Sequence, residues 1–427
     1  MPESFLRKAM TYFHYKKNKL YCEDTAIDTI AKHVKTPFYV YSKHTLIDRY
    51  KEIDDAFSSV PHLICYSVKS NGTLAIINEL RKHTCGFDIV SEGELFRCLR
   101  VGVRPHRIVF AGVGKRPEEI EYALDSDILM FNCESISEIK TINAVAALKK
   151  QTARIAIRVN PNVDAKTHRK ITTGKKENKF GIPLSELPVV IKVIRQCNNI
   201  ELKGLHCHLG SQITTVEPYT RALKKITPHL IALKKKKFPI EYINLGGGFG
   251  VSYHNEKTIS PKQCAHAIIP YVKKTRCTLI LEPGRYISAP AGALITEIIH
   301  LKKSPTKQFA IVDAGMNDFM RPALYDAWHH IMPLKKKTTA SRTTRKYDIV
   351  GPVCESSDVF GYGRVLPNPE QGDILAIMAT GAYGFSMSSQ YNARPRSAEV
   401  MVTGKQWHII RKPERFADLV RGESILK

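Results

Sequence analysis

The stretch LICYSVKSNGTLAIINELRKHTCGFDIVSEGELFRCLRV, residues 63–101, contains two short apolar runs, each followed by a longer amphipathic segment. The runs LICYSV and FDIV have the length and composition of buried strands, whereas residues 73–83 and 92–101 have helical periodicity. A strand followed by a helix is the repeating half of a βαβ unit, which places successive strands parallel in one sheet. The stretch therefore predicts an α/β fold.

The same alternation continues toward the C-terminus. Six more strand-like runs are RIVFA at 107, ILMFN at 128, IAIRV at 155, LKGLHCHL at 202, YINL at 242 and TLILE at 278. Between them, residues 134–149, 184–196 and 261–274 have the pattern or composition of helices. Eight βα units that close on themselves form a TIM barrel. We predict such a (β/α)8 barrel over residues 36–283.

After Glu282 the helical segments give way to strand-like runs separated by Pro, Gly and Asn. These runs are AGALITEIIHL, QFAIVDAG, YDIVGPVC, GDILAIMATGAYG and AEVMVTGKQWHIIRK. They predict a second, all-β domain, a β-sandwich, over residues 284–427. Residues 1–35 fit no barrel unit, and we assign them to this domain, to which they could add strands.

Composition excludes several classes of protein. The 427 residues are 43% hydrophobic and 25% charged, which is ordinary for a globular chain. No apolar run approaches the ~18 residues of a membrane span, and the opening MPESFLRKAM lacks a signal peptide's apolar stretch, so we expect a cytoplasmic protein. The ten cysteines form no CxxC pair, which argues against a zinc ribbon or a disulfide scaffold, and we expect no metal site.

The net charge of +25 would suit nucleic acid, an anionic membrane or small anions. The main lysine runs, at 234–237 and 335–337, lack the interleaved aromatic residues of nucleic-acid-binding surfaces. We therefore favour solvated surface over a nucleic-acid site for these runs.

Unusual polar residues follow the predicted barrel strands, where TIM barrels carry their catalytic groups. They are Lys69 after strand one, Asp88 and Glu94 after strand two, Arg158 and Asn160 after strand five, His208 and Ser211 after strand six, Gly246–Gly248 after strand seven, and Glu282 and Arg285 after strand eight. Any one of them alone is more often an ordinary surface or packed residue. Their convergence from separate strands indicates an active site.

The glycines at 246–248 let backbone N–H groups approach an anion closely, since no Cβ is in the way. Barrels often bind phosphate in the loops after strands seven and eight, where Arg285 also lies. GGGFGV lacks the third glycine of the GxGxxG dinucleotide motif, and a plain tight turn remains an alternative. A buried lysine, a phosphate site and a carboxylate such as Glu282 together suggest pyridoxal phosphate.

The chain resembles the diaminopimelate decarboxylases, which belong to the alanine-racemase-like, fold type III decarboxylases. These enzymes depend on pyridoxal 5'-phosphate. The motifs that carry the resemblance run in order from about residue 36 to residue 396. They are YSVKSN, FDIVSEGEL, RVNP, KFGI, HCHLGSQ, NLGGGFG, EPGR, DAGMNDFMRPALYDAWHH, GPVCESSD and GAYGFSMSSQYN. Ten ordered motifs make a chance match very improbable.

The resemblance implies roles for residues that match the family's motifs. Lys69 matches the Schiff-base lysine, His208 the imidazole stacked on the cofactor ring, and Glu282 the partner of the ring nitrogen. The other cofactor-binding positions implied are Asp88, Glu94, Arg158, Ser211, Gly247, Gly248, Gly284, Arg285 and Tyr383.

The substrate-binding positions that the resemblance implies are Arg285, Arg321, Tyr325, Glu355 and Tyr383. Arg321 and Tyr325 match residues that bind the substrate's far carboxylate. Cys354 matches an acid that the other subunit of a homodimer donates together with Glu355. Ornithine and lysine end in a cation, so an arginine at the far end of the pocket favours diaminopimelate.

The implied reaction is decarboxylation of meso-2,6-diaminopimelate to L-lysine and carbon dioxide, the last step of lysine biosynthesis. One alternative is a decarboxylase of another amino acid or of a carboxylated polyamine. Another is a catalytically silent regulator, which the presence of Lys69, Glu282 and Cys354 disfavours. Ser67, Ser70 and Glu92 depart from the family pattern, and we expect modest effects on the polarity of the pocket.

Overall fold

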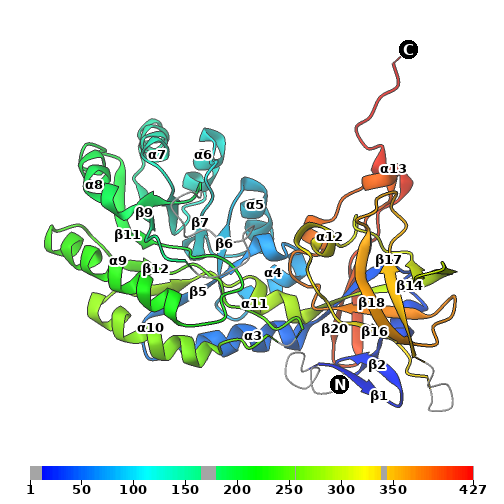
Figure 1. Cartoon of the computed structure of the whole chain (residues 1–427). Coiled ribbons are helices and arrows are strands. Elements are labelled where there is room, and N and C mark those ends of the chain that lie inside the picture. The colour runs from blue at the N-terminus through cyan, green and yellow to red at the C-terminus, as the bar shows by residue number, and fades with distance from the viewer. Residues whose placement is uncertain (1–11, 165–178, 255, 338–343, 427) are drawn as a thin grey trace. The chain divides into compact units, whose positions relative to one another are not determined.

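The computed structural model describes residues 12–164, 179–254, 256–337 and 344–426. Contacts divide the chain into two compact units, here called the barrel unit and the β unit (Figure 1). The barrel unit comprises Asp48–Val251 and Lys257–Tyr286, and the β unit comprises Met1–Ile47, Ser252–Glu256 and Ile287–Lys427.

Eight parallel strands close into a barrel, because each pairs with the next and the last, β13, pairs with the first, β5. The strands are β5 (His62–Ser67), β6 (Gly86–Ile89), β7 (Ile108–Phe110), β8 (Met130–Cys133), β9 (Ala153–Asn160), β11 (Ile200–His206), β12 (Tyr242–Asn244) and β13 (Thr278–Leu281). All eight predicted runs are confirmed as barrel strands. A two-residue strand, β10 (Ile182–Pro183), adds to β9 outside the closed ring.

Helices alternate with the strands. They include α4 (Leu74–Arg81), α5 (Glu92–Arg100), α6 (Pro117–Asp125), α7 (Ile136–Leu148), α8 (Leu187–Arg195), α9 (Glu217–Lys235) and α10 (Pro261–Thr275). Local chemistry defines where they begin: the Ser91 side chain caps α5 by accepting from the Glu94 N–H, and Ser260 with Gln263 forms a capping box before α10.

Apolar side chains from β5, β7, β8, β9 and β13 pack inside the barrel, with Cys65, Val109, Met130, Ala156 and Ile280 in one buried cluster. Polar side chains follow at the carboxyl ends of the strands. The barrel therefore has a packed apolar interior and a polar end at the carboxyl ends of its strands, as is typical of this fold.

The β unit is mostly sheet. Its longest strand, β14 (Gly292–Lys303), pairs antiparallel with β15 (Gln308–Val312), β19 (Ile374–Met378) and β4 (Phe38–Ser42). The remaining strands of this sheet are β16 (Ile331–Pro333), β17 (Thr344–Val350), β18 (Val359–Pro367), β20 (Ala398–Thr403) and β21 (Gln406–Arg411).

The start of the barrel differs from the expected organisation. The barrel was predicted from residue 36, but β4 lies in the β unit, where it pairs with β14 and β20, and the barrel unit begins at Asp48. The described residues near the N-terminus form a small sheet of their own, made of β1 (Phe13–Lys16), β2 (Lys19–Cys22) and β3 (Thr25–Ala26). A bridge between Lys19 and Lys335 joins this small sheet to the rest of the β unit.

Among the described residues, no helix has the length and apolar character needed to cross a membrane. The same residues contain no group of three or more His, Cys, Asp or Glu arranged to bind a metal ion.

Candidate active site

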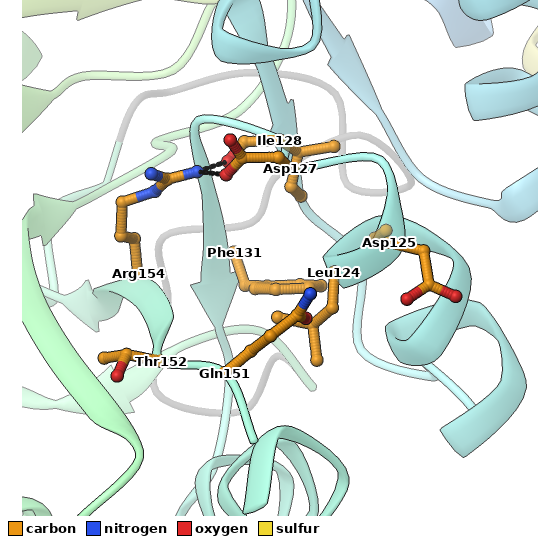
Figure 2. Close-up of a pocket in the computed structure, with 9 residues that line it drawn as sticks. Leu124, Asp125, Asp127, Ile128, Phe131, Gln151, Thr152 and Arg154 are labelled. Carbon is orange, nitrogen blue, oxygen red and sulfur yellow. Dashed lines mark hydrogen bonds and ion pairs between the residues drawn. The ribbon is translucent and has the colours of Figure 1, made fainter. Parts of the chain in front are cut away.

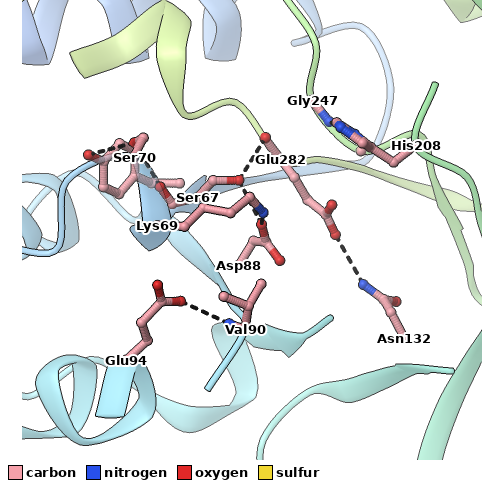
Figure 3. Close-up of polar contacts among 12 residues, drawn as sticks. Ser67, Lys69, Ser70, Asp88, Val90, Glu94, Asn132, His208, Gly247 and Glu282 are labelled. Atoms are coloured by element: carbon pink, nitrogen blue, oxygen red, sulfur yellow. Dashed lines mark hydrogen bonds and ion pairs between the residues drawn. The ribbon is translucent and has the colours of Figure 1, made fainter. Parts of the chain in front are cut away.

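The barrel places the predicted polar residues at the carboxyl ends of its strands (Figure 3). Lys69 lies in a 3-10 turn directly after β5, Asp88 lies in β6, and Glu94 lies in the first turn of α5. Arg158 lies near the end of β9, while His208, Gly246–Gly248 and Glu282 follow β11, β12 and β13.

The Lys69 amine donates to Asp88, with 2.6 Å between Nζ and Oδ2. The Asp88 side chain is fully buried, whereas the Lys69 side chain is 38% exposed, so the expectation of a buried lysine is wrong. The Ser67 hydroxyl lies 2.6 Å from the same Asp88 oxygen. Ser67, one of the departures from the family pattern, therefore adds a second donor to the carboxylate that faces the lysine.

Burial raises the pKa of Asp88, and the negative charge of Glu282 acts in the same direction. The positive charge of Lys69 and the hydrogen bonds from Lys69 and Ser67 oppose this shift. The Asp88 carboxylate thus depends on the lysine for stabilisation of its charge.

Glu282 is buried and held by three side chains. Its Oε1 accepts from Asn132 at 3.1 Å and from Asn244 at 2.6 Å, and its Oε2 lies 3.4 Å from His206 Nε2. Burial would raise the pKa of Glu282, but the charges of His206 and Lys69 and the hydrogen bonds outweigh it and lower that pKa. Glu282 is therefore a buried carboxylate that stays ionised.

Sequence reasoning missed Asn132, His206 and Asn244. Each lies at or next to the carboxyl end of its strand. An uncharged polar residue or a histidine is common at such a position, so the residue type did not single these three out. A signal was present in HCHLG, because His206 and His208 are two positions apart, a spacing that puts both on one face of an extended strand.

His208 is held as a neutral ring. Its Nδ1 accepts from the Gly247 N–H at 3.2 Å. Burial lowers the pKa of His208 well below its usual value, and the positive charges of Arg158 and Lys69 add to this effect. A neutral imidazole is a flat, uncharged face suited to stacking on an aromatic ring.

Arg158 is buried and fixed on two sides. Its guanidinium donates to Glu134 and lies 4.8 Å from the centre of the Phe180 ring. Glu134 in turn accepts from the Gly181 N–H at 2.8 Å. Glu134 thus connects Arg158 with the KFGI motif, a link that the sequence did not indicate.

Glu94 accepts from the Val90 N–H at 2.8 Å. Burial raises the pKa of Glu94 to about 7, although the positive charge of Lys69 opposes the shift. Glu92, another departure from the family pattern, is the first residue of α5, where a negative charge interacts favourably with the helix dipole. Its Oε1 lies 3.5 Å from a terminal nitrogen of Arg116.

The glycines after β12 are required by close packing. A Cβ on Gly247 would lie 2.2 Å from the Glu282 carbonyl oxygen, and one on Gly246 would lie 2.5 Å from His208 Nδ1. Gly248 has a φ of +103°, and a Cβ there would lie 2.6 Å from the Gly210 carbonyl oxygen. The loop therefore brings bare backbone against the strand ends on both sides.

Arg285 lies after β13 and is buried. Its Nε and one terminal nitrogen both donate to the Ser211 hydroxyl oxygen at 3.1 Å. Gly284 precedes it, and a Cβ there would lie 3.0 Å from the Cβ atoms of Ser67 and Ser70. The loops after β11, β12 and β13 thus supply a cation, a hydroxyl and backbone that carries no side chain, a donor set that suits a phosphate.

The residues present fit pyridoxal phosphate. Lys69 offers an amine for its aldehyde, and Glu282 offers an ionised buried carboxylate for its ring nitrogen. His208 offers a neutral ring, and Arg285 with the glycine loop offers donors for its phosphate. One Asp88 oxygen, Oδ1, is buried without a hydrogen-bond partner in the described part of the chain, which leaves this carboxylate able to accept a further donor.

The other predicted residues lie in the β unit. Cys354 is exposed, unlike the nine other cysteines, and its N–H donates to Asn392 at 3.0 Å. Glu355 is also exposed and accepts from the Tyr391 hydroxyl. The turn that carries them is held by buried Asp358, whose Oδ2 accepts from the Val353 N–H at 2.7 Å.

Arg321 and Tyr325 lie at the two ends of α12 (Arg321–Tyr325), where Arg321 is buried and Tyr325 is half-buried. Tyr383 has a φ of +55°, a left-handed conformation that few residues other than Gly, Asn and Asp adopt. Arg321 is thus a buried cation within the β unit.

A pocket of about 300 Å³ lies at the amino ends of β8 and β9, the end of the barrel opposite to Lys69, Asp88 and Glu282 (Figure 2). Its lining includes Asp127 and Arg154, which form an ion pair. Residues at the amino-terminal face of a TIM barrel usually contribute to stability and not to catalysis. We assign no role in the reaction to this pocket.

Comparison with known proteins places the chain among relatives. The family model described as "Pyridoxal-dependent decarboxylase, pyridoxal binding domain" matches residues 43–289. The diaminopimelate decarboxylase of Haemophilus influenzae is 44% identical over 98% of this chain and 100% of its own length. That of Vibrio cholerae is 43% identical over 98% of this chain and 100% of its own length.

Solved structures agree. Diaminopimelate decarboxylase of Helicobacter pylori, complexed with L-lysine, is 42% identical and has a TM-score of 0.89, covering 92% of this chain and 98% of that one. The enzyme from M. jannaschii, also in complex with L-lysine, is 38% identical with a TM-score of 0.91, covering 97% and 98%. The chain therefore belongs to the pyridoxal-dependent decarboxylases and, within them, to the diaminopimelate decarboxylase family.

Proposed function

We propose that this protein is a carboxy-lyase that converts meso-2,6-diaminopimelate to L-lysine and carbon dioxide with the help of pyridoxal 5'-phosphate. The observation that carries the proposal is the convergence of Lys69, Asp88 and Glu282 at one end of the barrel, in a chain 44% identical to a diaminopimelate decarboxylase. The reaction is the last step of lysine biosynthesis.

Lys69 would hold the cofactor covalently through its amine, and Asp88 stabilises the positive charge of that amine before the cofactor binds. Arg285, Ser211 and the backbone of Gly247, Gly248 and Gly284 bind the phosphate. Asp88, Glu94, Arg158 and Tyr383 complete the cofactor pocket.

When bound, pyridoxal phosphate supplies an electron sink for the bond that breaks at the amino-acid α-carbon. Glu282 would keep a proton on the ring nitrogen, because a buried ionised carboxylate stabilises an adjacent positive charge. Asn132 and Asn244 hold that carboxylate in one orientation. His208 would offer the ring a neutral face and so add no competing charge.

The carbon that loses carbon dioxide gains one proton, and we assign that proton to the Cys354 thiol. Cys354 and Glu355 act in the active site of the partner subunit of a homodimer. Their exposure supports this assignment, because a residue that serves a neighbouring subunit must lie on the surface of its own. Asp358 fixes the turn, and the thiolate recovers its proton from solvent.

Arg321 and Tyr325 bind the distal carboxylate of the substrate, while Glu355 contacts its amine and Arg285 and Tyr383 contribute to the same pocket. A guanidinium pairs with a carboxylate through charge-assisted hydrogen bonds and repels the ammonium end of ornithine or lysine. This difference favours diaminopimelate over the substrates of related decarboxylases.

Binding of nucleic acid remains a weaker alternative. The outer faces of α9 and α10 carry exposed basic residues, among them Lys224, Lys235, Lys262 and Lys273, but charge alone gives weak, salt-sensitive binding. We expect any such binding to disappear at physiological ionic strength.

Substrate choice is tested by comparing kcat/KM for meso-diaminopimelate, L-ornithine, L-arginine and L-lysine in the wild type and in Arg321→Ala. The variant should lose about ten- to hundred-fold in kcat/KM for diaminopimelate, the effect of one lost charge-assisted hydrogen bond. Its cofactor absorbance should stay unchanged. A wild type that prefers ornithine or arginine would reject the proposed substrate.

A further inference from the structure

Arg321 is held by a histidine that the proposed mechanism does not use. The guanidinium nitrogen NH1 of Arg321 lies 2.8 Å from His329 Nε2, and both side chains are buried. The other ring nitrogen of the histidine, Nδ1, lies 2.8 Å from the carbonyl oxygen of Met378 in β19. The three groups form a chain that anchors the guanidinium to the central sheet of the β unit.

The partners fix the protonation of His329. A guanidinium can only donate, so His329 Nε2 must present its lone pair to Arg321. A carbonyl oxygen can only accept, so His329 Nδ1 must carry the proton. The ring is therefore neutral, with the hydrogen on Nδ1.

A neutral acceptor has a consequence for the charge on Arg321. A carboxylate in the place of Nε2 would orient the guanidinium but would also cancel its charge. The imidazole nitrogen orients the guanidinium without adding a negative charge beside it.

Aromatic rings restrict the guanidinium and the imidazole further. The Arg321 guanidinium lies 4.7 Å from the centre of the Tyr253 ring, within the range of a cation–π contact. The same ring meets His329 edge-on at 4.9 Å, and Phe319 meets His329 edge-on at 4.8 Å. Tyr253 belongs to Ser252–Glu256, the short segment that continues the chain after the glycine loop and packs in the β unit.

We propose that His329 is a positioning residue that, together with Tyr253, fixes the direction of the Arg321 guanidinium and so determines specificity for a substrate with a second carboxylate. The inference rests on the proposed function, in which Arg321 binds that carboxylate. His329 acts through Arg321 and touches neither the cofactor nor the reacting carbon. A guanidinium held in advance binds a carboxylate with a smaller loss of side-chain freedom.

The first test compares His329→Leu, which removes the acceptor, with His329→Gln, whose side-chain oxygen can still accept from Arg321. In holoenzyme, His329→Leu should raise KM for diaminopimelate about tenfold or more with little change in kcat, and His329→Gln should recover most of the loss. The product L-lysine keeps the distal carboxylate, so its inhibition constant should rise in parallel with KM in His329→Leu, whereas that of cadaverine, which has no carboxylate, should stay within about twofold in both variants. An equal loss of cadaverine binding would mean general damage to the pocket and would overturn the proposal.

Tyr253→Leu against Tyr253→Phe provides a second, independent comparison, which also serves if His329→Leu does not fold. The phenylalanine keeps the ring over the guanidinium and should behave as the wild type, while the leucine should raise KM for diaminopimelate. Equal KM values for the two variants would contradict the role given to the ring.

A double-mutant cycle with Arg321→Ala decides between positioning and a separate structural effect. If His329 acts through Arg321, adding His329→Leu to Arg321→Ala should change kcat/KM for diaminopimelate by no more than about twofold. Additive losses would overturn the inference. Failure of the proposed function is distinguishable, since Arg321→Ala alone would then leave kcat/KM for diaminopimelate unchanged.

Discussion

Glu282 is a buried side chain that keeps its negative charge. Its carboxylate is buried, yet two amides and His206 hold it in place and its pKa is lowered despite burial. A buried charge is expensive unless it is paired and hydrogen-bonded, so this arrangement costs stability that a structural role would not require. We infer that it exists for the ring nitrogen of the cofactor.

Replacement of Glu282 by glutamine keeps the size of the side chain and removes its charge. Glu282→Gln should lower kcat for diaminopimelate by about 10²- to 10³-fold, the loss typical of removing one electrostatic stabiliser. Steady-state kinetics at saturating cofactor measure the effect. Glu241→Gln, which neutralises an exposed carboxylate just before β12, is the matched control and should change nothing. A kcat for Glu282→Gln close to that of the wild type would remove Glu282 from the mechanism.

Individual site residues were predictable when their type was unusual for their position. Lys69, Asp88 and Glu282 follow apolar strands as charged residues, so the sequence alone drew attention to them. Asn132 was not predictable, because its role depends on Glu282, 150 residues away, on the other side of a closed barrel. The same holds for His329, which gains meaning only from its contacts with Arg321 and Met378.

The loop after β12, Gly246–Gly248, has no space for added side chains. The closest atoms to a Cβ on Gly247 belong to the Glu282 backbone, which cannot move aside as a flexible side chain could. The loop and the end of β13 must therefore shift if any side chain is added there.

Gly247→Ala should weaken the affinity for pyridoxal phosphate about ten- to hundred-fold, since overpacking typically costs 1–3 kcal/mol. Titration of apoenzyme with the cofactor, followed by visible absorbance, measures this affinity. Gly114→Ala is the control, because nothing lies within 4 Å of a Cβ at Gly114. Equal cofactor affinity in the two variants would show that the close approach at Gly247 is unimportant.

The Ser252–Glu256 segment also forms an aromatic cluster around Trp328. His254 stacks on the Trp328 ring at 4.1 Å, and His330 meets it edge-on at 4.2 Å. Burial lowers the pKa of His330 to about 4, and the positive charges of His254 and Arg364 act in the same direction. Folding therefore excludes a proton that the unfolded chain would bind.

This shift predicts a loss of stability in acid. Between pH 6.5 and about 4 the unfolded chain binds the His330 proton and the folded chain does not, so the free energy of unfolding should fall as the pH falls through this window. Because the His330 ring is only half-buried, solvent screening keeps this effect below the limit of about 1.4 kcal/mol per pH unit for one proton. Denaturant unfolding followed by tryptophan fluorescence measures it. The slope should be smaller in His330→Gln, and equal slopes would contradict the prediction.

Regular elements were predictable where the pattern is local. The barrel strands are continuous apolar runs followed by helices, and each could be read from its own residues. Strand β4 has a similar apolar sequence, FYVYS, but its partners are β14 and β20, more than 250 residues later. Strand β18 contains Gly361 and Gly363, which weaken the pattern of a strand.

For the molecule as a whole, we propose that the exposed Cys354 acts in the active site of the other subunit of a homodimer. Lys69→Ala and Cys354→Ala should each be inactive alone. If subunits exchange randomly, the mixture should regain up to about a quarter of wild-type activity, because half of the dimers then have one intact site of two. No recovery in a mixture proven to contain heterodimers would place both residues in the site of a single subunit.

The high positive charge has no part in this account of catalysis. The lysines at 234–237 lie at and just beyond the C-terminal end of α9, where cations interact favourably with the helix dipole.

The most direct test of the central claim uses purified holoenzyme and meso-diaminopimelate labelled with carbon-13 in its carboxyl groups. The account predicts one labelled carbon dioxide and one L-lysine per substrate consumed, cofactor that borohydride links covalently to the wild type, and neither turnover nor this link in Lys69→Ala. Wild-type protein that binds the cofactor but releases no carbon dioxide from diaminopimelate, or Lys69→Ala with full turnover, would contradict it.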